Sequence, residues 1–200
     1  MTFFPDLAEA SMVDAGSHIR AIGWLDDEHS FPTGNSPTNF ADKLRELTQK
    51  CGESIKALGW DIFMGCHTCQ LCGKFKADLN LGVPTDELLY VAPEMILHYV
   101  EQHSYLPPQE FIDAVLQSPI PGTPEYTNAV AHFRELHAEF MDRQFDAMYE
   151  RAARDALDNG GDDDAIKDAA NRFCGGWDDE TFDRIASLVA ELAAQTHNAR

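Results

Sequence analysis

Residues 66–74 read Cys66-His67-Thr68-Cys69-Gln70-Leu71-Cys72-Gly73-Lys74 and contain two overlapping C-x-x-C units. Two thiolates separated by two residues and followed by glycine are typical of a zinc knuckle, because glycine lets the backbone fold beneath the metal. A knuckle of this kind supplies two of the four ligands of a tetrahedral site. The other two ligands must come from elsewhere in the chain.

Two histidines downstream of the knuckle have the spacing of such a second ligand pair. His98 and His103 are separated by four residues, within the roughly three to five found between paired histidine ligands of zinc. Together with Cys69 and Cys72 they predict a Cys2His2 site with Zn2+ as its cofactor. Residues five apart lie about 140° apart around an ideal helix, so this site requires the helix to tighten or unwind near His103.

Other uses of these residues stay open at this point. His67 lies two residues before Cys69 and is a reserve ligand, as is Cys66 if the knuckle folds differently. A thioredoxin-type redox pair is less favoured, because that motif opens a helix, whereas a glycine and a predicted strand follow Cys72. An iron–sulfur cluster needs four close ligands, and only three of the cysteines are close in sequence. Ordinary buried thiols without a metal are the remaining alternative.

The apolar pattern after the knuckle predicts a hairpin followed by a helix. Apolar and polar side chains alternate over residues 74–81, as in a half-buried strand, and residues 88–91 supply a second strand after a turn at 82–86. A helix that begins at Pro93 then carries both histidines. The order of knuckle, hairpin and helix is the one that a Cys2His2 site requires.

Further elements are predicted on both sides of this core. A strand is expected within residues 19–25, a helix from Ser36-Pro37 that ends before Gly52, and a short helix over residues 108–116.

Residues 118–124 contain three prolines and a glycine, and we expect a domain boundary there. Residues 1–118 are then a zinc-binding α+β domain. Residues 124–200 are a helical region with one long helix and two shorter helices, capped by Asp162 and Asp178. The predicted fold class is therefore α+β, with a small zinc-knuckle, β-hairpin and helix domain followed by a helical C-terminal extension.

The composition excludes some classes of partner. The 200 residues include 15 Lys plus Arg and 34 Asp plus Glu, so the formal net charge is −19. No basic block occurs, which argues against direct nucleic-acid binding, because such proteins neutralise phosphates with clustered Lys and Arg. The first residues lack the features of a signal peptide, and no apolar stretch is long enough to span a membrane. We expect a cytoplasmic protein that does not contact membranes, and whose long acidic helix contacts a basic partner.

Four short motifs carry a resemblance to a known family. They are Phe4-Pro5-Asp6-Leu7, Ile22-Gly23-Trp24-Leu25-Asp26 with His29-x-Phe31-Pro32-Thr33-Gly34, His67-x-Cys69-x-x-Cys72-Gly73, and His98-Tyr99-Val100-x-x-His103-x-Tyr105-x-Pro107-Pro108-x-x-Phe111. On these motifs, about residues 2–118 of the chain resemble a family of small bacterial proteins with a domain of unknown function. The family motif implies roles for His67, Cys69 and Cys72 but not for Cys66. The resemblance implies no activity.

Two functions are compatible with these features. The first is a zinc-stabilised, non-catalytic interaction module whose acidic surface binds a basic protein partner, in the way that an inhibitor or immunity protein captures a cationic toxin. The second is a small zinc-dependent enzyme, either with three protein ligands and an open water position or with His29 and His67 as acid and base beside the metal. The number of protein ligands separates the two.

Overall fold

The computed structural model describes residues 2–60 and 66–198. The chain divides into two compact units, Met1–Ala138 and Glu139–Arg200. The first unit combines helices with small sheets and the second is helical, so the predicted α+β class with a helical C-terminal region is confirmed. The predicted boundary within residues 118–124 stays a prediction.

The first unit is built on a three-stranded sheet in the order β1-β5-β4. Its central strand β5 (Leu89–Pro93) pairs in parallel with β1 (Ile19–Ala21) and antiparallel with β4 (Asn80–Pro84). The antiparallel pair β4–β5 confirms the predicted hairpin, but its strands run further than predicted. Residues 82–84, expected in the turn, belong to β4, where Gly82 pairs with Val91, and Pro93, expected to begin a helix, ends β5. All five residues of β5 are buried.

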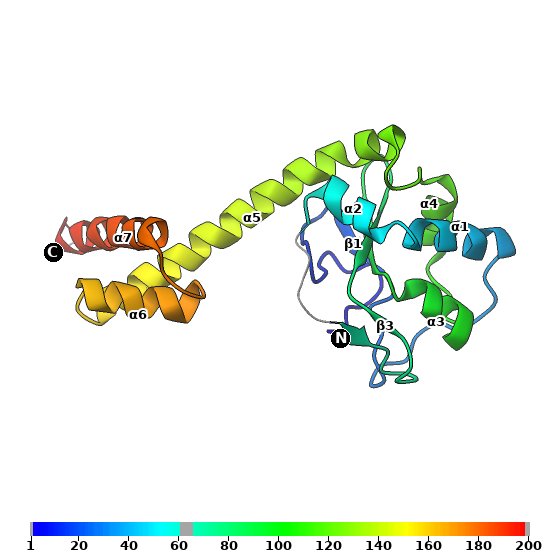
Figure 1. The fold of residues 1–200 in the computed structure, drawn as a ribbon, viewed down its shortest axis with the longest axis horizontal. Coiled ribbons are helices and arrows are strands. Elements are labelled where there is room, and N and C mark those ends of the chain that lie inside the picture. The colour runs from blue at the N-terminus through cyan, green and yellow to red at the C-terminus, as the bar shows by residue number, and fades with distance from the viewer. Residues whose placement is uncertain (1, 61–65, 199–200) are drawn as a thin grey trace. The chain divides into compact units, whose positions relative to one another are not determined.

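Burial of β5 reflects a separate hydrophobic core on each face of the sheet. Tyr90 and Ala92 belong to one core, together with residues of α1 (Thr38–Thr48), α3 (Ile96–His103) and α4 (Gln109–Gln117). Leu89 and Val91 belong to the other, together with residues of α2 (Cys51–Leu58) and of the first turns of α5 (Pro124–Asp158). The helices α1, α3 and α4 lie together at one side of the first unit (Figure 1). A strand covered on both faces needs apolar residues at every position. This explains why the strand reads as an apolar run in the sequence.

The predicted helix from residue 37 to residue 51 is wrong at its end. The structure has two helices, α1 and α2, which are separated at Gln49 and Lys50. Gly52 does not end a helix but lies in the first turn of α2, with open space where a Cβ would be. The break has a physical reason: the apolar residues of α1 pack on one face of the sheet, whereas Ile55 and Leu58 of α2 pack on the other.

The single strand predicted over residues 74–81 is also divided in the structure. Its first part is β3 (Lys76–Ala77), which pairs antiparallel with β2 (His67–Thr68), and its second part is β4 of the main sheet. The chain therefore passes from a two-stranded ribbon that holds the cysteine cluster into the core sheet. Alternation of side chains alone does not reveal which partner each half takes.

The second unit consists of the C-terminal part of α5 together with α6 (Asp163–Phe173) and α7 (Asp179–Asn198). Its core is small and rich in alanine, with Ile166, Ile185 and Val189 as the larger buried side chains. The predicted caps are confirmed, because Asp162 accepts a hydrogen bond from the backbone N–H of Ala165 at 2.9 Å and Asp178 accepts one from Thr181 at 2.8 Å.

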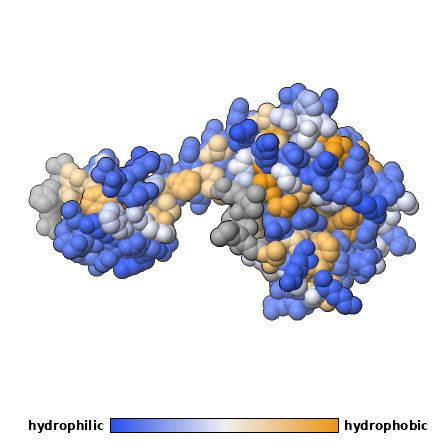
Figure 2. All heavy atoms as spheres, viewed as in Figure 1, coloured by the Kyte–Doolittle hydropathy of each residue, from blue (hydrophilic) through white to orange (hydrophobic). Residues whose placement is uncertain are grey.

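Hydrophilic residues cover most of the visible surface of each unit, and hydrophobic residues form smaller patches (Figure 2). Among the described residues, the large hydrophobic side chains that are exposed are Phe75, Leu116, Phe145 and Trp177. Within residues 2–60 and 66–198, no helix is both long enough and apolar enough to cross a membrane.

Candidate metal centre

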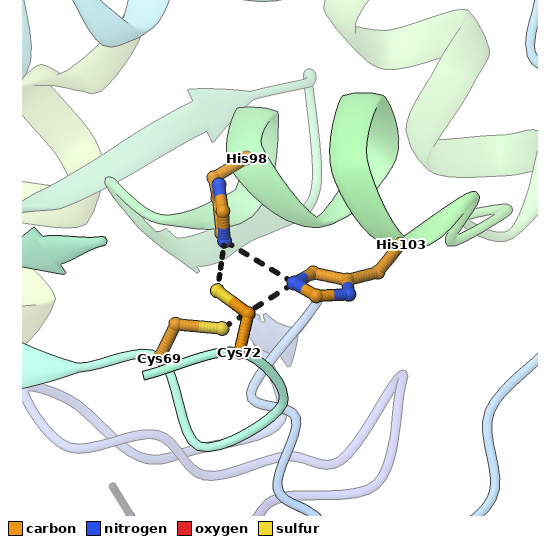
Figure 3. A group of neighbouring side chains, drawn as sticks. All are labelled: Cys69, Cys72, His98 and His103. Carbon is orange, nitrogen blue, oxygen red and sulfur yellow. Dashed lines mark hydrogen bonds between the residues drawn. The ribbon is translucent and has the colours of Figure 1, made fainter. Parts of the chain in front are cut away.

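The cysteine cluster folds into a tight turn between β2 and β3. The backbone N–H of Gly73 donates to the carbonyl oxygen of Cys69 at 2.7 Å, and the N–H of Cys69 donates to the carbonyl oxygen of Phe75 at 2.9 Å. Gly73 has a φ of 68°, in the left-handed region that favours glycine. Gly73 therefore allows the tight backbone turn that the sequence predicts, and Cys69 and Cys72 lie on the same side of this turn (Figure 3).

The two histidines meet these thiols from α3. His98 Nε2 lies 3.4 Å from Cys72 Sγ, His103 Nε2 lies 3.5 Å from Cys69 Sγ, and the two Nε2 atoms are 3.2 Å apart. All four potential ligand atoms lie within 4.8 Å of one another. His98 points down from the start of α3 and His103 reaches back from its end (Figure 3). The helix continues to His103 and stops at Ser104, which has a φ of 53°. The two imidazole rings therefore reach one point beside the helix from its first turn and from its last residue (Figure 3).

The protein environment favours the deprotonated forms of two of these groups. The backbone N–H of Lys74 lies against the Cys72 sulfur and lowers the pKa of that thiol, and burial lowers the pKa of His98. Burial raises the pKa of the Cys69 thiol, whose side chain is fully buried. A cation bound between the four atoms would offset that cost, because it stabilises the buried thiolate. The Cys69, Cys72, His98 and His103 cluster could therefore bind a metal ion.

A cavity of about 690 Å³ lies beside this cluster, and Cys72, His98 and His103 form part of its wall. The Phe75 ring stacks on the ring of His98, with centroids 4.6 Å apart and an interplanar angle of 10°, and lines the same cavity. Cys69 is not among the lining residues. The cluster thus has a buried side and a side that faces the cavity.

Neither reserve ligand joins the group. His67 lies on β2 and pairs with Ala77, and Cys66 is exposed at the start of that ribbon. Among the residues that the structure describes, it brings together the four histidine and cysteine side chains that were predicted from their spacing.

A half-buried carboxylate braces the segment that follows His103, and residue spacing does not predict it. Both oxygens of Asp6 accept hydrogen bonds from the Tyr105 hydroxyl at 2.8 Å, and Oδ1 also accepts from the N–H of Gly23 at 2.9 Å. The three residues come from three of the four motifs described above. The motifs are far apart in sequence but converge here, and the signal that pointed to Asp6 was its place in one of them.

His29, considered above as an acid or base beside a metal, is held instead by a neighbouring carboxylate. Its Nδ1 lies 2.9 Å from Asp26 Oδ1, and its ring stacks on Phe3 with centroids 3.9 Å apart. His29 is not part of the metal-ligating group.

A family of known proteins matches the part of the chain that contains this cluster. The family described as Domain of unknown function (DUF7919) matches residues 2–116. The chain belongs to this family. The DUF7919 domain contains all four cluster residues and ends within α4, before the helical C-terminal region begins. No curated protein and no solved structure gives a significant match to the chain.

Proposed function

We propose that this DUF7919 protein is a zinc-stabilised, non-catalytic interaction module with an acidic surface for a basic protein partner. The distances within the cluster support zinc as the ion. A tetrahedral zinc with Zn–S of about 2.3 Å and Zn–N of about 2.0 Å separates two nitrogen ligands by about 3.3 Å and a sulfur from a nitrogen by about 3.5 Å. The corresponding distances here are 3.2 Å between nitrogens, and 3.4 and 3.5 Å between sulfur and nitrogen.

Four protein ligands favour a structural role for the ion. A zinc ion that is coordinated by four side chains has no open position for water, and it stabilises a fold rather than activating a nucleophile. The cluster joins the β2–β3 ribbon to α3. Both are short elements, because each strand of the ribbon has two residues and the helix has eight. We assign the protein to the cytoplasm, because thiolate ligands remain reduced there.

A zinc-dependent enzyme is the alternative, and the cavity beside the cluster is the observation that favours it. Three of the four candidate ligands line a space of about 690 Å³, which falls within the range of small-molecule sites. If one of them were displaced, a water molecule could take its place at the metal. X-ray absorption at the zinc edge separates the two functions: two sulfur and two nitrogen ligands support the structural role, and an oxygen ligand in place of one of them supports the enzyme.

The zinc assignment is tested with matched cysteine variants. We expect one zinc per chain by elemental analysis and a lower melting temperature after treatment with a chelator. Cys69→Ser should lose the zinc and the stabilisation, because a serine hydroxyl does not replace a thiolate ligand. Cys66→Ser and His67→Ala are the controls and should keep both. Zinc-free wild-type protein, with a melting temperature that chelators do not change, would contradict the proposal.

The basic partner is supported by the distribution of charge. The net charge of −19 favours attraction of cationic proteins over a long range. A second cavity, of about 680 Å³, lies between the β4–β5 turn, α4 and the start of α5, and its wall includes Asp86, Glu110 and Asp113. The described residues that line it include no lysine or arginine. This cavity is the surface that we expect to receive a basic side chain.

A charge-reversal experiment tests this part of the proposal with a defined probe. Binding of an oligolysine peptide, with an oligoglutamate peptide as the negative control, is measured by titration at low and high salt. The double variant Asp86→Lys/Glu110→Lys should bind more weakly than Asp27→Lys/Glu28→Lys, which has the same net charge but is altered at exposed residues outside the cavity and outside α5. Equal weakening in both variants would show that net charge alone attracts the peptide and that the cavity has no role.

A further inference from the structure

The two cysteines of the cluster differ in their access to solvent. Cys69 is 0% exposed and belongs to the hydrophobic core of the first unit, whereas Cys72 is partly exposed and lines the cavity of about 690 Å³. A small electrophile that enters the cavity therefore meets the sulfur of Cys72 first. His98 and His103 line the same cavity, but an imidazole nitrogen that is bound to zinc has no free lone pair for attack.

We propose that Cys72 is a site of oxidation by hydroperoxides, and that oxidation releases the zinc as a Cys69–Cys72 disulfide forms. This inference rests on the proposed zinc site and adds a means of regulating it. Two observations support this inference: the Cys72 thiol faces the cavity, and the buried Cys69 thiol lies within 4.8 Å of it.

The chemistry needs only a peroxide as co-reactant. The Cys72 thiolate attacks one oxygen of hydrogen peroxide, the O–O bond breaks, and with one proton the products are a sulfenic acid and water. The Cys69 thiolate then attacks the sulfenic sulfur, the S–O bond breaks, and with a second proton a second water leaves. The two thiolates lose two electrons to the peroxide. The disulfide retains none of the thiolate charge that binds the metal, so Zn2+ leaves.

The geometry favours Cys69 over Cys66 as the second thiol. The sulfurs of Cys69 and Cys72 are at most 4.8 Å apart and lie on one turn, and a disulfide requires about 2.05 Å. Cys66 is exposed, outside the cluster and before the start of β2. A short closure of the turn between Cys69 and Cys72 is therefore sufficient, whereas a bond to Cys66 would require the ribbon to open.

Loss of zinc would remove the link between the turn and α3. That link consists of the contacts of Cys69 with His103 and of Cys72 with His98, with Phe75 stacked on His98 at the edge of the cavity. The oxidised protein should therefore melt at the temperature of the chelator-treated protein. A peroxide would then switch the module from its zinc-stabilised form to a less stable one.

The experiment uses the full-length, zinc-loaded chain and hydrogen peroxide as the probe. A chromophoric indicator measures released zinc, mass spectrometry of proteolytic peptides locates the disulfide, and a thiol reductant with added zinc tests reversal. Cys66→Ser is the matched control. It leaves Cys69 and Cys72 as the cysteines of their tryptic peptide, and it should release zinc at the rate of the wild type.

Release of one zinc per chain with a Cys69–Cys72 disulfide, reversed by reductant, would support the inference. Retention of zinc by the loaded protein under peroxide would overturn it, as would a disulfide to Cys66 or slower release from Cys66→Ser. These results differ from failure of the zinc site itself, which appears before peroxide is added as the absence of bound metal.

Discussion

Gly82 on β4 lies in close contact with two helices that cover the sheet of the first unit, α2 and α5. A Cβ at this position would lie 2.4 Å from Leu58 Cδ1 on α2 and 3.3 Å from the hydroxyl of Tyr126 on α5. The Tyr126 hydroxyl donates to the carbonyl oxygen of Gly82 at 2.8 Å and contacts the Ser54 hydroxyl at 2.6 Å, and the Ser54 oxygen accepts from the N–H of Gly82 at 2.9 Å. One glycine thus allows both close packing and a buried polar network.

We expect Gly82→Ala to destabilise the protein by about 1–3 kcal/mol, as is typical of overpacking in a core. Chemical denaturation of the first unit measures the change. Gly52→Ala is the matched control, because a Cβ at Gly52 meets nothing within 4 Å and the residue lies in α2. That substitution should stabilise the protein by about 0.5–1 kcal/mol through helix propensity. This account would be contradicted if Gly82→Ala destabilised the protein no more than Gly52→Ala does.

Asp6 predicts a specific dependence of stability on pH. Burial raises the pKa of its carboxyl above the value of 3.8 in the unfolded chain, although the hydrogen bonds from Gly23 and Tyr105 act in the other direction. Because the folded state holds this proton more tightly, ionisation of Asp6 removes stability as the pH rises through the folded pKa. Asp6→Asn should therefore gain stability relative to the wild type between pH 4 and neutrality. The difference between the two denaturation curves, measured across this range, isolates the effect, and an opposite slope would contradict it.

At the level of elements, the sequence predicts most helices and misses where two segments divide. Periodicity predicts α4, α5, α6 and α7 nearly to their ends. In α4, α6 and α7 one apolar stripe packs against one core, and α5 keeps its helical periodicity although its two ends pack against different cores. It fails between α1 and α2, where the apolar stripe changes from one face of the sheet to the other. It fails again between β3 and β4, where the strand partner changes. The pattern of apolar side chains indicates which residues are buried, but it does not indicate which element or which face of the sheet they pack against.

The cluster itself was predictable in its residues because ligand spacing within the knuckle and within α3 is local. Its surroundings were not predictable, because the contacts that brace it are remote in sequence. Asp6 and Tyr105 are 99 residues apart. His98 and His103 lie about 140° apart around an ideal helix, yet their rings meet. They do so because each side chain extends from its own end of the short helix α3 toward the same point (Figure 3).

The N-caps of the second unit give a prediction about single helices. Asp162 accepts from the N–H of Ala165 at the start of α6, so Asp162→Ala should cost about 1 kcal/mol. Faster amide hydrogen exchange in α6 would show the effect directly. Asp168→Ala is the control, because Asp168 is an exposed residue inside the same helix and caps nothing. Equal acceleration in both variants would show that loss of negative charge, rather than loss of the cap, is responsible.

At the scale of the whole molecule, the two units depend on different sources of stability. The first unit has two large cores and the candidate metal-binding cluster, whereas the second has one small core in which alanine predominates. Small cores bury little apolar surface per residue and are correspondingly marginal. The zinc ion that we propose should therefore stabilise the first unit only, because all four candidate ligands lie within Met1–Ala138.

Calorimetry of the full-length chain tests this separation with two perturbations. Removal of zinc by a chelator should lower the melting temperature of one transition and leave the other unchanged. Ile185→Val, which removes one methyl group from the core of the second unit, should do the reverse, at a cost of about 1 kcal/mol and a shift of about 4–8 °C. Hydrogen exchange assigns each transition to residues 2–138 or 139–198. If both perturbations shifted a single common transition, the two units would unfold together, and the zinc would stabilise the whole chain through the helix α5 that both units share.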